Sequence, residues 1–180
     1  MTEIVLLTGP TSAGKSTIGQ SLQVALGGRT VWMEADRCFP RICPSPSVSL
    51  RDKALAFHRS ALAWPASGFR LILDGSLPYE DRYARDECLV ILRDYPLLIV
   101  GVIADAATLR ARESRREDRV QGRALAQAAD IHSGVQLDCV VNTSVDSVES
   151  CVAQIIAKMR VGQVPGDRAL DDAAPTHHQS

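Results

Sequence analysis

Gly9-Pro10-Thr11-Ser12-Ala13-Gly14-Lys15-Ser16 matches the pattern G-x-x-x-x-G-K-[ST]. The apolar run Ile4–Leu7 comes shortly before it and predicts a buried strand. The residues that follow, Lys15–Leu26, have a helical pattern that ends at two glycines, which are a good stop signal. Strand, glycine-rich loop and helix in this order form the context in which the pattern binds phosphate. The chain is therefore predicted to begin with a phosphate-binding β–loop–α unit.

Each residue type in this loop has a chemical task. Gly9 and Gly14 let the backbone curl so that its N–H groups point at phosphate oxygens, and the following helix directs its positive end to the same place. Lys15 is expected to reach the β- and γ-phosphates, and the Ser16 hydroxyl to bind Mg²⁺. The alternative, a chance glycine-rich turn, is disfavoured by the correct flanking elements. ATP and Mg²⁺ are the predicted cofactors, and the predicted nucleotide-binding residues are Gly9, Pro10, Thr11, Ser12, Ala13, Gly14, Lys15, Ser16 and Thr17.

Beyond the loop, apolar runs alternate with helical patterns. Runs without polar alternation are typical of strands that are buried on both faces of a parallel sheet. The five runs are Ile4–Leu7, Val31–Met33, Leu71–Leu73, Leu97–Ile103 and Leu137–Val141. We expect an α/β fold of three layers, with a five-stranded parallel sheet and helices on both faces. Residues 1–160 are predicted to form one domain, and residues 161–180, which lack periodicity, a flexible tail.

The remaining helices are predicted from amphipathic patterns and capping residues. The predicted ranges are Arg51–Trp64, Tyr79–Leu92 and Ala106–Arg116, the last with Asp105 as its N-cap. A final helix carries apolar residues at helical spacing from Val148 to Met159. Asp146, followed three residues later by Glu149, predicts a capping box at its start.

The composition of the chain indicates which classes of binding partner and which cellular compartment to expect. A net charge of −1 gives no general attraction to nucleic acid or to an anionic membrane, and no apolar run is long enough to span a bilayer. The 5 cysteines are scattered without metal-site spacing, which favours free thiols and a cytoplasmic location. We therefore expect a small-molecule partner and no nucleic acid or membrane partner. The oligomeric state is left open, with a homo-oligomer as one option.

Two aspartates follow predicted strands, at the edge of a parallel sheet where ligands gather. Asp74 ends the third apolar run and is predicted to bind Mg²⁺ or the acceptor, with a loop cap as the alternative. Asp36 follows the second run and is a candidate base for an acceptor hydroxyl. Glu34 competes for that role, and both acids are also compatible with a solvent-exposed position.

A cluster of arginines lies between residues 110 and 123. A solvated helix face explains several of them, and Arg110 and Arg112 are assigned to it. The helical pattern breaks near Glu117–Gly122, which is compatible with an arginine-bearing lid that closes on transferring phosphate. The residues predicted to serve there are Arg116 and Arg119, followed by Arg115 and Arg123.

These residues together resemble the chloramphenicol phosphotransferase family of P-loop small-molecule kinases. The resemblance covers most of residues 3–160 and rests on Gly9–Thr17, Asp36, the strand that ends at Asp74, and the stretch from Glu113 to Val141. Its most specific parts are Arg116-Glu117-Asp118-Arg119-Val120-Gln121-Gly122 and Ala128–Val135, which are similar to the family's lid and the helix that leaves it.

The resemblance implies transfer of the ATP γ-phosphoryl group to a hydroxyl of a small molecule. The acceptor that it implies first is a chloramphenicol-like antibiotic. It implies that Asp36 is the general base and that Arg116 and Arg119 are lid arginines, with Lys15 as the further catalytic residue. Asn142 stands where relatives often carry aspartate near the adenine pocket, so ATP-versus-GTP preference stays open. Two other functions also stay open: phosphorylation of a nucleoside, a sugar acid or another antibiotic, and nucleotide-dependent regulation without an acceptor.

Overall fold

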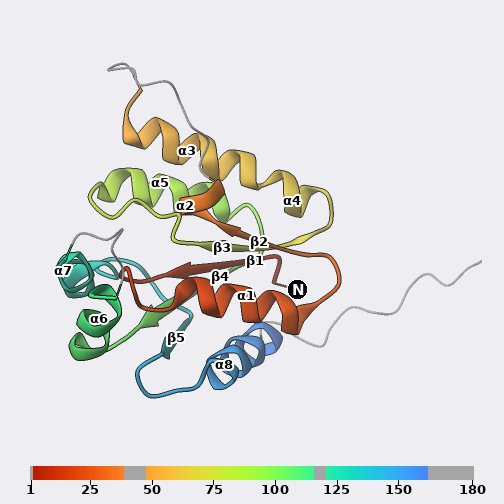
Figure 1. Cartoon of the computed structure of the whole chain (residues 1–180). Helices are drawn as coiled ribbons and strands as arrows, with labels where there is room; N and C mark the ends of the chain where they lie inside the picture. The colour runs from red at the N-terminus through yellow and green to blue at the C-terminus, as the bar shows by residue number, and fades with distance from the viewer. Residues whose placement is uncertain (1, 39–47, 116–120, 162–180) are drawn as a thin grey trace, which may run out of the picture.

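The computed structural model describes residues 2–38, 48–115 and 121–161. Its five strands form one parallel sheet in the order β2-β3-β1-β4-β5 (Figure 1). The strands are β1 Ile4–Thr8, β2 Thr30–Glu34, β3 Arg70–Asp74, β4 Leu97–Ile103 and β5 Cys139–Asn142. The helices are α1 Lys15–Leu26, α2 Ala35–Cys38, α3 Leu50–Ala61, α4 Ala63–Ala66, α5 Arg82–Leu92, α6 Ala106–Glu113, α7 Arg123–Asp130 and α8 Val148–Val161. The predicted α/β fold with a five-stranded parallel sheet is confirmed.

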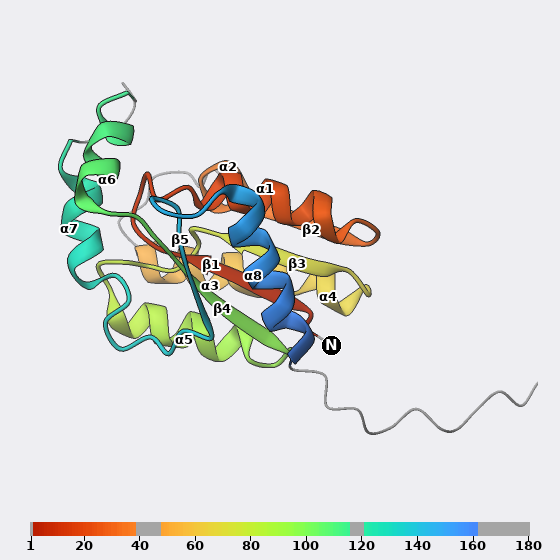
Figure 2. The ribbon, with the colours of Figure 1, turned by 90° about the horizontal axis from the view of Figure 1, so that it is seen from below.

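Alternate residues of the strands bury into opposite layers, because successive side chains of a strand point to opposite faces. On one face, Val5 and Leu7 of β1 pack with Ile18 of α1 and Ile155 of α8. On the other face, Ile4 and Leu6 pack in a cluster with α3 and α5 (Figures 1 and 2). Both faces are apolar, which explains why these strands appear in the sequence as continuous runs.

Two of the predicted helices differ from the observed ones on the β3 side of the sheet. The predicted helix Arg51–Trp64 is divided at Leu62 into α3 and α4, and α3 begins one residue earlier, where Ser49 and Asp52 form a capping box. The helix predicted over Tyr79–Leu92 begins only at Arg82, because the Asp81 carboxylate accepts the Ala84 N–H and caps it there. The two observed starts follow from local capping bonds that the hydrophobic period does not reveal.

The second half of the chain shows further differences. α6 ends at Glu113 and not at Arg116, although Asp105 caps its start as predicted. α7 was not predicted from periodicity, and it ends at Asp130, so the helix inferred over Ala128–Val135 is mostly a turn. The cap predicted at Asp146 is wrong: Ser147 Oγ accepts the Ser150 N–H at 3.2 Å. Of the predicted tail, residues 161–180, Val161 is the last residue of α8, and residues 162–180 lie outside the described residues.

The parallel strands bring their carboxyl ends to one edge of the sheet. α6 and α7 lie at one end of the sheet in both views (Figures 1 and 2). On the α3 side, Nε2 of the buried His58 lies 3.1 Å from Ser76 Oγ and so links that helix to the loop after β3. The other ring nitrogen, Nδ1, lies 2.7 Å from the Ala54 carbonyl of the same helix. His58 is fully buried, so it packs α3 against the loop after β3 through its contact with Ser76. Within the described ranges, no helix is both long and apolar enough to span a membrane.

Candidate functional site

The loop that leaves β1 adopts a conformation that requires glycine. Gly9 has φ 153°, and a Cβ atom placed there would stand 2.1 Å from the backbone oxygen of Val102 on β4. Gly14, at the start of α1, has φ 94° in the left-handed region. The loop can therefore lie flat on the sheet and turn directly into the helix only with glycine at these two positions.

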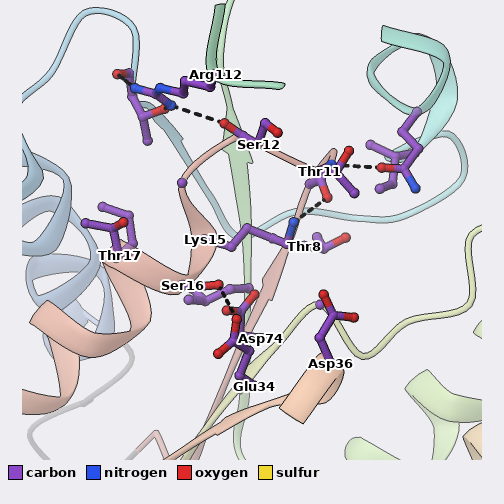
Figure 3. A pocket seen from close by; sticks show the side chains of 18 of the residues that line it. Thr8, Thr11, Ser12, Lys15, Ser16, Thr17, Glu34, Asp36, Asp74 and Arg112 are labelled. Atoms are coloured by element: carbon purple, nitrogen blue, oxygen red, sulfur yellow. Dashed lines mark hydrogen bonds between the residues drawn. The ribbon is translucent and has the colours of Figure 1, made fainter. Parts of the chain in front are cut away.

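Two elements that are distant in the sequence, the segment after β5 and helix α7, form hydrogen bonds to the loop. Thr143 Oγ1, just after β5, donates to the Ala13 carbonyl at 2.7 Å. The Thr11 N–H donates to Gln127 Oε1 of α7 at 2.8 Å, the bond that leaves Thr11 in Figure 3. The loop is thus shaped by hydrogen bonds to residues more than one hundred positions away.

Lys15 is the first residue of α1, and its ammonium group lies in the mouth of the loop. Its Nζ donates to the carbonyls of Gly9 at 3.0 Å and Pro10 at 2.9 Å. Because the loop curls around this side chain, the ammonium and the loop share one cavity, of about 590 Å³. A positive charge among backbone amides at a helix N-terminus is suited to a polyphosphate.

Seven of the nine predicted nucleotide-binding residues line that cavity. Ala13 does not, because its side chain is fully buried behind the loop. Pro10 also does not line it, and its carbonyl accepts from Lys15. The seven that do are Gly9, Thr11, Ser12, Gly14, Lys15, Ser16 and Thr17.

Three carboxylates gather below Lys15 in Figure 3. The β2–β3 register pairs Glu34 with Asp74, so the final residues of these strands are neighbours. Ser16 Oγ donates to Glu34 Oε1 at 3.0 Å, and Arg37 Nε lies 2.8 Å from Glu34 Oε2. Asp36 follows on the short helix α2 and lines the same cavity.

Burial raises the pKa of the Asp74 carboxyl, the Lys15 ammonium opposes this change, and the charges of Glu34 and Asp36 add to it. The Asp74 side chain is 2% exposed, and its Oδ2 atom accepts no hydrogen bond from the described residues. A buried carboxylate with an unused oxygen, beside a hydroxyl and a second carboxylate, fits Mg²⁺, which takes few protein ligands and keeps waters and phosphate oxygens. In the described part of the chain, no cluster of three or more His, Cys, Asp or Glu side chains could hold a metal ion by itself. The described residues therefore do not fit a metal site whose ligands all come from the protein.

The arginines of α6 differ from expectation at one position. Arg112 was assigned to a solvated face, but its guanidinium lies at the cavity (Figure 3). Its Nη1 donates to the Ser12 carbonyl at 3.3 Å and to Thr143 Oγ1 at 2.9 Å. Arg115 and Arg123 also line the cavity. Arg116 and Arg119, the residues predicted for the lid, lie outside the described residues.

Gln127 is a second residue that the sequence analysis missed. α7 buries only two of its side chains, Ala124 and Gln127, which are three positions apart. A glutamine on the buried stripe of a short helix is a polar group that needs a partner, and that is the signal which could have identified it. Near the other end of the cavity, the Asn142 side chain accepts the Ser144 N–H at 3.0 Å, while Thr143 and Asp146 line the cavity.

Comparison with solved structures identifies the fold. A sugar kinase from Janibacter sp. HTCC2649 superposes with a TM-score of 0.62 at 18% identity, covering 89% of this chain and 96% of that one. A gluconokinase from Sinorhizobium meliloti 1021 gives 0.59 at 17% identity, with 87% and 91% covered. The Mycobacterium tuberculosis APS kinase, solved with AMPPNP and APS, gives 0.58 at 14% identity, with 88% and 98% covered. These likenesses show a P-loop kinase fold.

Sequence comparison gives a narrower result. No similar sequence was found among curated proteins. The family model described as chloramphenicol phosphotransferase-like protein matches residues 2–160, which is most of the chain. Together with the P-loop kinase fold, this match identifies the protein as a P-loop small-molecule kinase. The chain belongs to the chloramphenicol phosphotransferase-like family.

Proposed function

We propose that this protein transfers the γ-phosphoryl group of ATP to a hydroxyl of a neutral small molecule, with a chloramphenicol-like antibiotic as the first candidate. The observation that carries the proposal is the position of Asp36. This residue lines both the 590 Å³ phosphate cavity and a second cavity of about 310 Å³. A carboxylate between a donor site and an acceptor site is suited to orient a hydroxyl and take its proton.

The donor side is formed by the loop and the strand ends. The loop amides and Lys15 would hold the β- and γ-phosphates, and Arg112 would contribute positive charge at the rim. Ser16 and Asp74 would hold Mg²⁺, with Glu34 as a further acid beside Ser16. When bound, Mg²⁺ neutralises charge on the phosphates during transfer. The hydrogen bond from Ser16 and the contact with Arg37 favour this role for Glu34 over that of general base.

The acceptor side is mostly apolar. The second cavity is lined by Ala35, Asp36, Leu50, Ala54, Gly75, Ser76, Leu77 and Pro78. None of these described residues carries a positive charge, so this part of the lining offers nothing to pair with a carboxylate or a phosphate on the acceptor. This favours an uncharged alcohol with an apolar body over a sugar acid. A drug of this kind would be inactivated by the added phosphate, which is the basis for proposing a role in antibiotic resistance.

Asp36 is the proposed general base, and Lys15 the proposed electrostatic catalyst. Arg116 and Arg119 remain proposed partners of the transferring group on the strength of the family resemblance. Loss of one preorganised electrostatic contact commonly lowers the rate about 10²–10³-fold. We expect Asp36→Asn to fold normally and lose turnover by a factor of this order, and Lys15→Ala to lose turnover as well.

The test is mass spectrometry of a reaction that contains the protein, Mg·ATP and chloramphenicol, with Lys15→Ala as the control. A phosphorylated drug that forms only with the wild type supports the reaction, the donor and the acceptor together. A parallel reaction with gluconate, a nucleoside and other hydroxylated antibiotics addresses the alternative acceptors. Slow formation of ADP without any phosphorylated product would contradict the kinase proposal and favour a regulatory nucleotide-binding protein.

A further inference from the structure

The hydrogen bond between Thr11 and Gln127 joins two parts of the site that are 116 positions apart in the sequence. Gln127 is 5% exposed, and it lines the phosphate cavity together with Thr11. The backbone N–H can only donate, so the carboxamide oxygen must face the loop. The other half of the carboxamide is an N–H₂ donor at the wall of the same cavity.

α7 is held firmly to α6 and to the segment before α5. The Glu113 carboxylate, at the end of α6, accepts the N–H groups of Gly122 at 2.7 Å and Ala124 at 2.9 Å. The Tyr79 hydroxyl, just before α5, lies 2.8 Å from Asp130 Oδ1 at the other end of α7. A displacement of the loop at Thr11 would therefore act, through Gln127, on a helix that is hydrogen-bonded at both ends to its neighbours.

Thr11 is four residues before Lys15 and lines the same cavity, and the β- and γ-phosphates are expected at Lys15. A γ-phosphoryl oxygen and Gln127 Oε1 are two acceptors for one Thr11 N–H. Bonds to charged acceptors are the stronger, and a carboxamide that loses its donor can turn its own N–H₂ toward the same oxygen. An adenosine diphosphate has no group at this position, so it leaves the Thr11–Gln127 bond intact.

We propose that Gln127 is a positioning residue that senses the γ-phosphoryl group and couples its presence to the α6–α7 pair. The inference rests on the proposed function, because it takes ATP as the donor. Gln127 would then contribute to the binding of a nucleoside triphosphate and little to that of the diphosphate. A purely structural glutamine would instead affect both nucleotides equally, through the shape of the loop.

The experiment is isothermal titration calorimetry of the full chain with Mg·AMPPNP and, separately, Mg·ADP. Gln127→Ala removes both halves of the carboxamide. Gln127→Glu keeps an acceptor for the Thr11 N–H, and with it the loop contact, but places a negative charge where the phosphate would lie. Gln20→Ala is the matched control, because that glutamine is exposed on α1 and does not line the cavity. Circular dichroism verifies that each variant is folded.

We expect Gln127→Ala to weaken AMPPNP about tenfold or more relative to ADP, in line with the loss of a hydrogen bond to a charged group. Gln127→Glu should weaken AMPPNP further and leave ADP close to the wild type, and Gln20→Ala should change the affinity for neither nucleotide. Equal losses for both nucleotides in both Gln127 variants, or no loss, would overturn the role of Gln127 alone. Wild-type protein that binds neither nucleotide would overturn this inference together with the proposed function.

Discussion

Glu113 provides the most demanding test of how the site is held together. Its side chain is 2% exposed, and its two carboxylate oxygens accept the N–H groups of Gly122 and Ala124 at the start of α7. We predict that Glu113→Ala lowers the free energy of unfolding substantially and that Glu113→Gln lowers it by a smaller amount. The alanine leaves both amides without their acceptor, whereas glutamine keeps one carbonyl oxygen.

The size of the effect follows from the two bonds. A hydrogen bond to a charged group contributes about 1.5–3 kcal/mol. The Gly122 amide lies on an exposed residue and can recover water, whereas Ala124 is fully buried. Glu113→Ala is therefore expected to cost about 3 kcal/mol, and Glu113→Gln about 1–1.5 kcal/mol. For a chain of this size, 3 kcal/mol corresponds to a fall in Tm of about 6–12 °C.

Urea denaturation followed by circular dichroism, with linear extrapolation, measures this change. Glu87→Ala is the matched control, because Glu87 is a glutamate that also makes two bonds to one partner, Arg51, but both side chains are nearly half exposed. An exposed pair of this kind contributes about 0–1 kcal/mol. If Glu113→Ala were no more destabilising than Glu87→Ala, the idea that a buried carboxylate anchors α7 would be wrong.

Three further predictions concern pH, charge and backbone. Burial lowers the pKa of His58 in the folded chain, so on acidification the unfolded chain binds a proton at a higher pH than the folded chain does. The free energy of unfolding should therefore fall as pH drops below about 6.5. Urea titrations at pH 5.5 and 7.5 should show this loss, and the loss should be smaller in His58→Gln. Burial raises the pKa of Asp74, so its charged form opposes folding above that pKa. Asp74→Asn should therefore raise the free energy of unfolding at pH 8 while turnover falls about 10²-fold. A variant less stable than the wild type would contradict this. Gly9→Ala would place a Cβ 2.1 Å from the Val102 oxygen and should prevent folding. Gly27→Ala meets nothing within 4 Å and adds only backbone strain at φ 55°, so it should fold and cost about 1–3 kcal/mol, a difference that thermal melts can measure.

The strands and the loop could be predicted from the sequence because their signals are local. The buried runs contain no polar alternation, and the loop has two glycines followed by Lys15 and Ser16. The parallel order then places Glu34, Asp36 and Asp74 at one edge of the sheet, as the sequence analysis expected for both aspartates. These inferences needed no knowledge of tertiary contacts.

Arg112 and Gln127 could not be predicted for the opposite reason. The Arg112 bond to the Ser12 carbonyl spans 100 positions, and the Gln127 bond to Thr11 spans 116. Charge pattern alone assigns an arginine on a short helix to solvent, and nothing in the neighbouring residues says otherwise. The predicted helix boundaries were also wrong by a few residues. At α8, for example, the observed N-cap is Ser147, one residue after the predicted Asp146.

The long-range bonds of the loop have a consequence for the order in which the chain is synthesised. The phosphate-binding motif leaves the ribosome before most of the fold, yet Thr11 finds its partner at Gln127 and Ala13 finds its partner at Thr143. A nascent chain that ends after β3 contains the whole motif but neither of these partners, nor β4, on which Gly9 rests. Domains generally fold as units during synthesis. Competence to bind nucleotide should therefore arise only after Gln127 and Thr143 have emerged.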